Sequence, residues 1–207
     1  MKELTETEKL QRGQIHPNSK FGKVLTELAK TSNNIVEIGT WRGLGSTKCL
    51  HLGMVRPDQR MWTIELCEAQ HNEAKTYYDD PRIRFLLGTL VRAWEVPAFE
   101  YPDQSFKQYY DVEVEINANA PYVFRKLPET IDLLLIDGGS WSGEIEFKKL
   151  APRSKIIALD DTNPKREIKN VRTREQLIKD KWIVLHDEIE DRNGWAVFKR
   201  PEVVDVT

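Results

Sequence analysis

The chain has few cysteines, no long apolar run and almost no net charge. Two cysteines, Cys49 and Cys67, are too few for a disulfide framework in 207 residues. No run of about 18 apolar residues occurs, which argues against a transmembrane helix, and the first residues, MKELTETEKLQRGQ, lack the apolar core of a secretory signal. We therefore expect a soluble, cytoplasmic protein with no membrane partner. The 31 basic and 33 acidic residues nearly cancel, which disfavours nucleic-acid binding.

The order of apolar and helical stretches predicts the fold. Short β-branched runs alternate with helical patterns, as in a mostly parallel sheet with helices on both faces, and the length suits a single domain spanning 1–207. The expected strands are 35–39, 61–66, 83–87, 131–137, 155–160, 182–187 and 194–200, and the expected helices are 18–30, 46–54, 68–78, 143–150 and 163–179. Only about six residues separate the last two strands, too few for a parallel crossover. The fold class is therefore a doubly wound, Rossmann-like α/β domain with a seven-stranded sheet whose last strand is antiparallel.

Residues 88–130 interrupt this alternation with four prolines and many aromatic residues. The aromatic residues are Trp94, Phe99, Tyr101, Phe106, Tyr109, Tyr110, Tyr122 and Phe124. A connection of about forty residues is unusually long, so we expect an insertion with its own helix at about 105–117 and a role as a lid. Its aromatic side chains must be buried, either against the sheet or around a ligand or a second subunit of a homodimer.

A glycine-containing loop, GTWRGLGS (residues 39–46), follows the first expected strand. Glycines allow a sharp turn and a close approach of ligand to backbone, and the next helix N-terminus can bind a carboxylate. The G-x-x-x-G-x-G spacing is neither the G-x-G-x-x-G of nicotinamide and flavin enzymes nor a P-loop. Glu65 ends the second strand, where a carboxylate can accept both hydroxyls of a ribose. The alternative is that the glycines serve only helix–sheet packing and Glu65 is a solvated strand end.

These features resemble the class I S-adenosylmethionine (SAM)-dependent methyltransferases over about residues 18–200. The resemblance rests on EIGTWRGLGS (37–46), the acidic end of the second strand, the apolar strand ending in Asp137 and the antiparallel final hairpin. It implies SAM as cofactor, with Glu65 holding the ribose and residues 88–90 beside the adenine. The implied cofactor-binding residues are Glu37, Gly39, Thr40, Trp41, Gly43, Gly45, Ser46, Glu65, Gly88, Thr89, Leu90 and Asp137.

Three aspartates end two neighbouring strands. Asp137 ends one strand and Asp160 and Asp161 end the next, so their carboxylates should meet at one edge of the sheet. Carboxylates that close repel unless a cation or a proton neutralises them, and Mg²⁺ is a natural hard cation for such a site. The alternative is that Asp160 or Asp161 caps the next turn and that Asp137 is a lone acid. The triplet is similar to the metal site of the cation-dependent O-methyltransferases, closest to their sugar-modifying branch.

The general base of that family is missing from the corresponding positions. The catechol enzymes have a lysine three residues after the metal-binding aspartate, and the sugar enzymes have a histidine there or an aspartate one residue earlier. This chain has Ser140 and Gly139 at those positions. Either another group takes the proton, the metal alone suffices, or the chain does not catalyse this reaction. The candidate groups are Asp161, Glu144 and His186, although His186 in an apolar strand suits a structural role.

The expected function is therefore SAM-dependent O-methylation of a small hydroxylated acceptor, with a sugar-like acceptor and Mg²⁺ assistance as the finer hypothesis. Asp137 and Asp161 are the candidate catalytic residues, and Mg²⁺ would be held by Asp137, Asp160 and Asp161. One alternative is an inactive methyltransferase-like binding or scaffold protein, for which the missing base is the evidence. A second alternative is an NAD-dependent oxidoreductase, which the glycine spacing disfavours.

Two other features remain open at this stage. A mixed charged run after the fifth strand contains Lys165, Arg166, Glu167, Lys169, Arg172, Arg174 and Glu175. Such a helix face is usually solvated, so contact with a substrate is the less favoured interpretation. Trp141, four residues after Asp137, forms either one wall of the acceptor pocket or a cover for the edge of the sheet.

Overall fold

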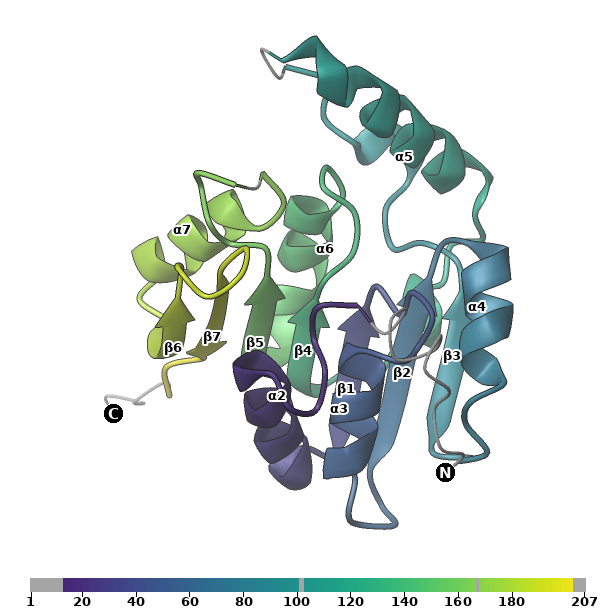
Figure 1. Ribbon diagram of the computed structural model, residues 1–207, viewed down its shortest axis with the longest axis vertical. Helices are drawn as coiled ribbons and strands as arrows, with labels where there is room; N and C mark the ends of the chain where they lie inside the picture. Colours follow the sequence, from purple (N-terminus) through teal and green to yellow (C-terminus); the bar gives the residue numbers. More distant parts are fainter. Residues whose placement is uncertain (1–12, 101–102, 167, 203–207) are drawn as a thin grey trace.

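A computed structural model describes residues 13–100, 103–166 and 168–202 of the chain (Figure 1). Predictions for residues 1–12, Tyr101, Pro102 and Glu167 fall outside these residues. The strands are β1 (Asn34–Ile38), β2 (Arg60–Glu65), β3 (Ile83–Leu87), β4 (Ile131–Ile136), β5 (Ser154–Asp160), β6 (Ile183–Glu188) and β7 (Trp195–Lys199). The α-helices are α2 (Lys20–Thr31), α3 (Ser46–Gly53), α4 (Glu68–Lys75), α5 (Lys107–Asn119), α6 (Gly143–Leu150) and α7 (Val171–Lys179). No helix of the described part combines the length and apolarity that crossing a membrane requires.

The strands form one seven-stranded sheet in the order β3-β2-β1-β4-β5-β7-β6. β7 runs antiparallel to β5 and β6, and the other pairs are parallel, so the predicted doubly wound fold with an antiparallel last strand is confirmed. The chain leaves β1 toward β2 on one side and continues from β4 to β5 on the other. A crevice therefore opens at the carboxyl ends of β1 and β4, which is where ligands bind in this type of sheet.

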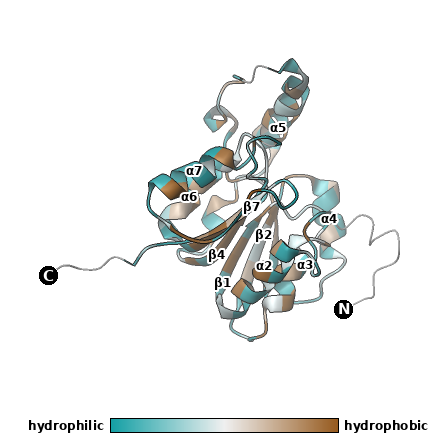
Figure 2. Cartoon of the chain, turned by 60° about the vertical axis from the view of Figure 1, so that its left-hand side comes forward, coloured by the Kyte–Doolittle hydropathy of each residue, from teal (hydrophilic) through white to brown (hydrophobic). Residues whose placement is uncertain are grey.

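The sheet is apolar on both faces because helices cover both of them. On one face, Phe147 of α6 and Leu177 of α7 belong to the same buried cluster as Leu134 of β4. On the other face, α2 and α3 pack on the sheet, and Phe21 of α2 stacks on Trp195 of β7 with 4.7 Å between ring centroids. Figure 2 shows the strands of the sheet mainly in brown, flanked by helices in which teal and brown residues alternate.

The helix expected to begin at Asn163 begins instead at Val171. Asn163 stabilises a turn: its side-chain oxygen accepts from the Lys165 N–H at 2.9 Å, and its amide donates to the Ile189 carbonyl at 2.9 Å. Asn170 is the N-cap, and its side-chain amide donates to main-chain carbonyls at the ends of β4 and β5. The described residues just before α7 are therefore a loop held against the sheet edge.

The insertion between β3 and β4 carries α5 where the sequence predicts a helix, and Figure 1 shows α5 extending beyond the carboxyl edge of the sheet. Trp94 and Tyr109 are not buried against the sheet, because they are 77% and 69% exposed, so for these two residues only burial by a ligand or a second subunit stays a prediction. Phe99 and Tyr110 cluster with Trp141 from the loop after β4, with 5.3 to 6.3 Å between ring centroids. The roles as a lid and as a homodimer contact stay predictions.

Candidate active site

A cavity of about 420 Å³ opens at the carboxyl ends of β1, β2 and β4. Pockets for cofactors and small ligands commonly have volumes of about 300–1,000 Å³. The predicted cofactor-binding residues that line it are Gly39, Thr40, Trp41, Gly45, Ser46, Glu65, Gly88, Thr89 and Asp137. The switch point of the sheet thus brings most of the predicted cofactor site together.

Three predicted cofactor-binding residues, Glu37, Gly43 and Leu90, do not line this cavity, and their contact with the cofactor stays a prediction. Glu37 lies buried beneath the glycine loop, where it accepts hydrogen bonds from Ser46 at 2.6 Å and Thr47 at 2.7 Å. Burial raises the pKa of Glu37 to about 7, although these hydroxyl hydrogen bonds oppose the shift. Gly43 faces α4, and Leu90 is fully buried in the core. These three residues therefore pack beneath the residues that line the cavity.

Glu65 fixes the loop after β1. One of its oxygens accepts from the Trp41 N–H at 2.7 Å, and the other accepts from the Cys67 N–H at 2.8 Å. Burial raises the pKa of Glu65, and these backbone hydrogen bonds oppose the rise. The interpretation as a solvated strand end is wrong, because Glu65 is only 8% exposed. A carboxylate offers about four lone-pair sites, so Glu65 can accept further hydrogen bonds from hydroxyl groups.

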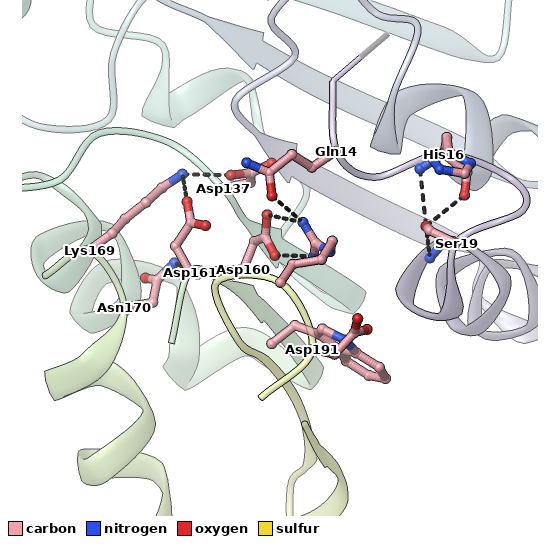
Figure 3. A network of polar contacts seen from close by, with 12 residues as sticks. Gln14, His16, Ser19, Asp137, Asp160, Asp161, Lys169, Asn170 and Asp191 are labelled. Atoms are coloured by element: carbon pink, nitrogen blue, oxygen red, sulfur yellow. Dashed lines mark hydrogen bonds and ion pairs between the residues drawn. The ribbon is translucent and has the colours of Figure 1, made fainter. Parts of the chain in front are cut away.

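The three aspartates meet at the carboxyl ends of β4 and β5, as predicted. One oxygen from each of Asp137, Asp160 and Asp161 lies within 4.8 Å of the others, so Asp137 is not a lone acid. Two cations lie at the cluster, and Figure 3 shows the first of them, Lys169, pointing toward Asp137 and Asp161. Lys169 Nζ lies 2.5 Å from Asp137 Oδ1 and 3.2 Å from Asp161 Oδ2, and Arg192 Nη2 lies 2.6 Å from Asp160 Oδ1.

Neither cation was connected with the aspartates at the sequence level. The solvated-face interpretation is wrong for Lys169, whose side chain is only 10% exposed. Burial by itself would lower the pKa of Lys169, but Asp137 and Asp161 outweigh it, so the pKa lies above its ordinary value. The sequence analysis predicted that the helix after β5 begins at Asn163, whereas α7 begins at Val171. Lys169 was therefore assigned to a helix, although it lies in a loop that turns its side chain toward the aspartates. Arg192 lies in the β6–β7 hairpin and had no motif to identify it.

The oxygen donors of the three aspartates suit a hard divalent cation in number and spacing. Their charges, however, are already paired: Asp137 and Asp161 with Lys169, and Asp160 with Arg192. The donor set with its surroundings therefore does not fit a divalent ion as it stands. The assignment of Mg²⁺ to these aspartates stays a prediction.

A second cavity of about 310 Å³ lies between the insertion and the loop before α7. Trp141 lines it, which agrees with its predicted role as a pocket wall, and Lys169 also lines it. Glu144 lies at this cavity too, but its carboxylate pairs with Lys148 at 2.7 Å. His186 lies in β6 with its ring 5.7 Å from that of Trp195, and it lines neither cavity. These contacts favour the structural interpretation of His186.

Glu146 of α6 is a site residue that the sequence analysis missed. It lines the first cavity, is 3% exposed, and its Oε2 has no hydrogen-bond partner. Burial raises the pKa of Glu146 to about 8, with a further contribution from Glu113 and opposition from Lys169 and Lys149. The only sequence signal was an acid on the apolar face of a helix, next to Phe147. An unpaired buried oxygen at a cavity wall is suited to bind a polar group of a ligand.

Glu146→Gln is expected to raise the free energy of unfolding relative to the wild type, by an amount that grows as the pH rises. The folded protein retains the proton of Glu146 up to about pH 8, whereas the unfolded chain loses it near 4.5, so the wild type loses stability between these values. The loss approaches 1.4 kcal/mol per pH unit, or a few kcal/mol in total. Urea unfolding of both proteins from pH 4.5 to 8 should show midpoints that diverge with pH. Glu144→Gln on the same helix is the control, and parallel curves for Glu146→Gln would refute the expectation.

The strand order and the antiparallel β7 are those expected from the resemblance to the class I SAM-dependent methyltransferases, and solved structures described as O-methyltransferases share this fold. The resemblance inferred from the sequence is therefore confirmed for the fold.

Solved structures with similar folds include O-methyltransferases. One is a candidate caffeoyl-CoA O-methyltransferase from Staphylococcus aureus, with a TM-score of 0.63 and 16% identity over 95% of this chain and 90% of that one. Another is an O-methyltransferase from Bacillus cereus in complex with SAH. Its TM-score is 0.58, with 17% identity over 94% of this chain and 88% of that one. A third is TomG from Streptomyces achromogenes, an O-methyltransferase involved in tomaymycin synthesis, in complex with SAM. Its TM-score is 0.54, with 14% identity over 94% of this chain and 86% of that one. Neither a family model nor a curated protein matches the sequence.

Proposed function

We propose that the protein is a SAM-dependent methyltransferase that acts on an oxygen of a small hydroxylated molecule. The observation that carries this proposal is the cavity at the β1/β4 switch point, with the buried carboxylate of Glu65 at the end of β2. The fold supports it, because structures with the same fold were solved with SAM or SAH bound. The glycine spacing and the antiparallel β7 disfavour the alternative of an NAD-dependent oxidoreductase.

The residues of the first cavity fit SAM. Glu65 would accept the two ribose hydroxyls, and Gly88 and Thr89 would lie beside the adenine. Glu146, whose Oε2 has no partner, would bind a polar edge of the adenine. Asp137 lies at the aspartate cluster, where the methionine part of SAM and the acceptor would meet.

The second cavity is the proposed acceptor site. An aromatic wall at Trp141 beside the charged Glu144 and Lys169 suits a hydroxylated ring, including a sugar-like one. When bound, SAM supplies a methyl group to the acceptor oxygen and is released as S-adenosylhomocysteine (SAH). Asp161 would accept the proton that the hydroxyl loses, because its carboxylate lies at the first cavity and contacts Lys169 of the second. The remaining requirement is alignment of the oxygen with the methyl group.

SAH is expected to raise the melting temperature of the wild type, and Glu65→Gln is expected to weaken SAH binding about 10- to 100-fold. The substitution keeps the shape of the side chain but removes the charge that strengthens hydrogen bonds from the ribose hydroxyls. A ligand at about 100 times its dissociation constant adds about 2.7 kcal/mol, which is several degrees for a domain of this size. Thermal unfolding with SAH, SAM, NADH or buffer measures both effects.

Glu68→Gln is the matched control, because Glu68 is an exposed carboxylate three residues further along the chain. It should leave the SAH shift unchanged. A shift with NADH and none with SAH would favour the oxidoreductase. No shift with either would contradict the proposal and favour a scaffold protein without cofactor.

A further inference from the structure

The aspartate cluster contains its own cations, delivered by two loops from opposite sides. Lys169 reaches Asp137 and Asp161 from the loop before α7 (Figure 3). Arg192 reaches Asp160 from the β6–β7 hairpin. Asp161 and Arg192 adopt left-handed backbone conformations, with φ of +58° and +57°. Each costs on the order of 1 kcal/mol for a residue other than glycine. Asp161 pairs with Lys169 and Arg192 pairs with Asp160, so the strained backbone lies at one residue of each ion pair.

The ammonium of Lys169 already bridges two of the carboxylates that a divalent ion would bridge. It contacts one oxygen of Asp137 and one of Asp161, so an ion that joined these carboxylates would lie close to the ammonium or displace it. An ammonium group about 4 Å from a divalent ion repels it strongly in a partly buried site. Three carboxylates with two bound cations also leave a single negative charge, which attracts a divalent ion weakly.

Lys169 has the donors to act in place of an ion. An ammonium group has three N–H donors, and the contacts with Asp137 and Asp161 account for two of them. Lys169 also lines the second cavity, so its remaining donor would bind an oxygen of a molecule that reaches the aspartate cluster from there. A fixed positive charge beside that oxygen would stabilise the negative charge that develops when a hydroxyl loses its proton.

We propose that Lys169 takes the place of the divalent cation, so that Asp137, Asp160 and Asp161 bind no Mg²⁺. The catalytic meaning of this substitution rests on the proposed function. The exclusion of the ion rests only on the ion pairs, so it can be tested without knowing the acceptor.

The first experiment titrates Mn²⁺, a hard cation visible by electron paramagnetic resonance, into the wild type with and without SAH. We expect no saturable Mn²⁺ site at millimolar concentration. A saturable wild-type site that disappears in Asp137→Asn would overturn the proposal.

The second experiment uses Lys169→Met, which removes the ammonium but keeps a long side chain. We expect this variant to bind Mn²⁺ at least about 100-fold more tightly than the wild type, because the carboxylates lose their bridging cation. Adding Asp137→Asn should abolish the new site, and Lys165→Met, at an exposed position of the same loop, should not create one. Folding of Lys169→Met only in the presence of Mn²⁺ would support the proposal equally. A folded variant that binds no Mn²⁺ would overturn it.

Calorimetric titration of the same wild-type samples with SAH separates this inference from the proposed function. Binding of both SAH and Mn²⁺ would overturn the inference and leave the methyltransferase assignment standing. Binding of neither would contradict the methyltransferase assignment and leave the exclusion of the ion supported.

Discussion

Gly39→Ala is expected to lower the free energy of unfolding by about 3 kcal/mol or more and to abolish the thermal shift caused by SAH. Gly39 turns the chain from β1 into the loop with φ of +93°, and an added Cβ would lie 2.2 Å from the Asp137 carbonyl oxygen. That distance is far inside van der Waals contact, and the Asp137 carbonyl oxygen belongs to the backbone, which moves less readily than a side chain. Alanine must therefore push apart the ends of β1 and β4, where the first cavity opens.

Gly43→Ala is the matched control, because Gly43 lies in the same loop with φ of +72°. An added Cβ there would lie 3.0 Å from the Cβ of Ala74, a contact that a small shift of α4 relieves. We expect only the backbone cost of about 1–2 kcal/mol and retained SAH binding. Urea unfolding and SAH-dependent melting measure both variants. An equal loss in the two would show that backbone strain, and not contact with Asp137, explains the Gly39 effect.

The sequence predicted the sheet well because its apolar strands are short, β-branched and separated by helical patterns. Even the antiparallel β7 followed from the short connection after β6. The error at Asn163 has a physical reason: an asparagine before a proline suits both a helix cap and a turn. The side-chain amide of Asn163 donates to the Ile189 carbonyl, 26 residues away, and this tertiary contact stabilises the turn. A local pattern cannot contain such a contact.

The site was predicted where it follows from topology and missed where it depends on loops. Strand ends meet by the rules of parallel sheets, so the meeting of Asp137 and Asp160 could be foreseen. The partners Lys169 and Arg192 arrive from irregular segments, and no spacing rule connects them with the aspartates. Glu146 was missed because a charged residue on a helix is normally assigned to solvent.

The missing base also has a structural explanation in Glu113 of α5. Its carboxylate accepts hydrogen bonds from the backbone N–H groups of Ser140 at 2.8 Å, Trp141 at 3.0 Å and Ser142 at 2.8 Å. A Cβ added to Gly139 would lie 2.3 Å from a carboxylate oxygen of Glu113. Gly139 and Ser140, where the resemblance would place a base, thus lie in the segment that attaches the insertion to the loop after β4.

Glu113→Gln is expected to detach α5 from that loop. An amide keeps one acceptor oxygen but turns an NH₂ group toward donors, so charge-assisted hydrogen bonds are lost and stability falls by about 2–4 kcal/mol. A helix of 13 residues is marginal without tertiary contacts, so the α5 amides should exchange with solvent at least about 10-fold faster. Hydrogen exchange and urea unfolding measure these effects. Glu115→Gln, exposed on the same helix, should change stability by less than about 0.5 kcal/mol. If Glu113→Gln leaves α5 equally protected, packing of Phe99 and Tyr110 on Trp141 holds the insertion in place without the carboxylate.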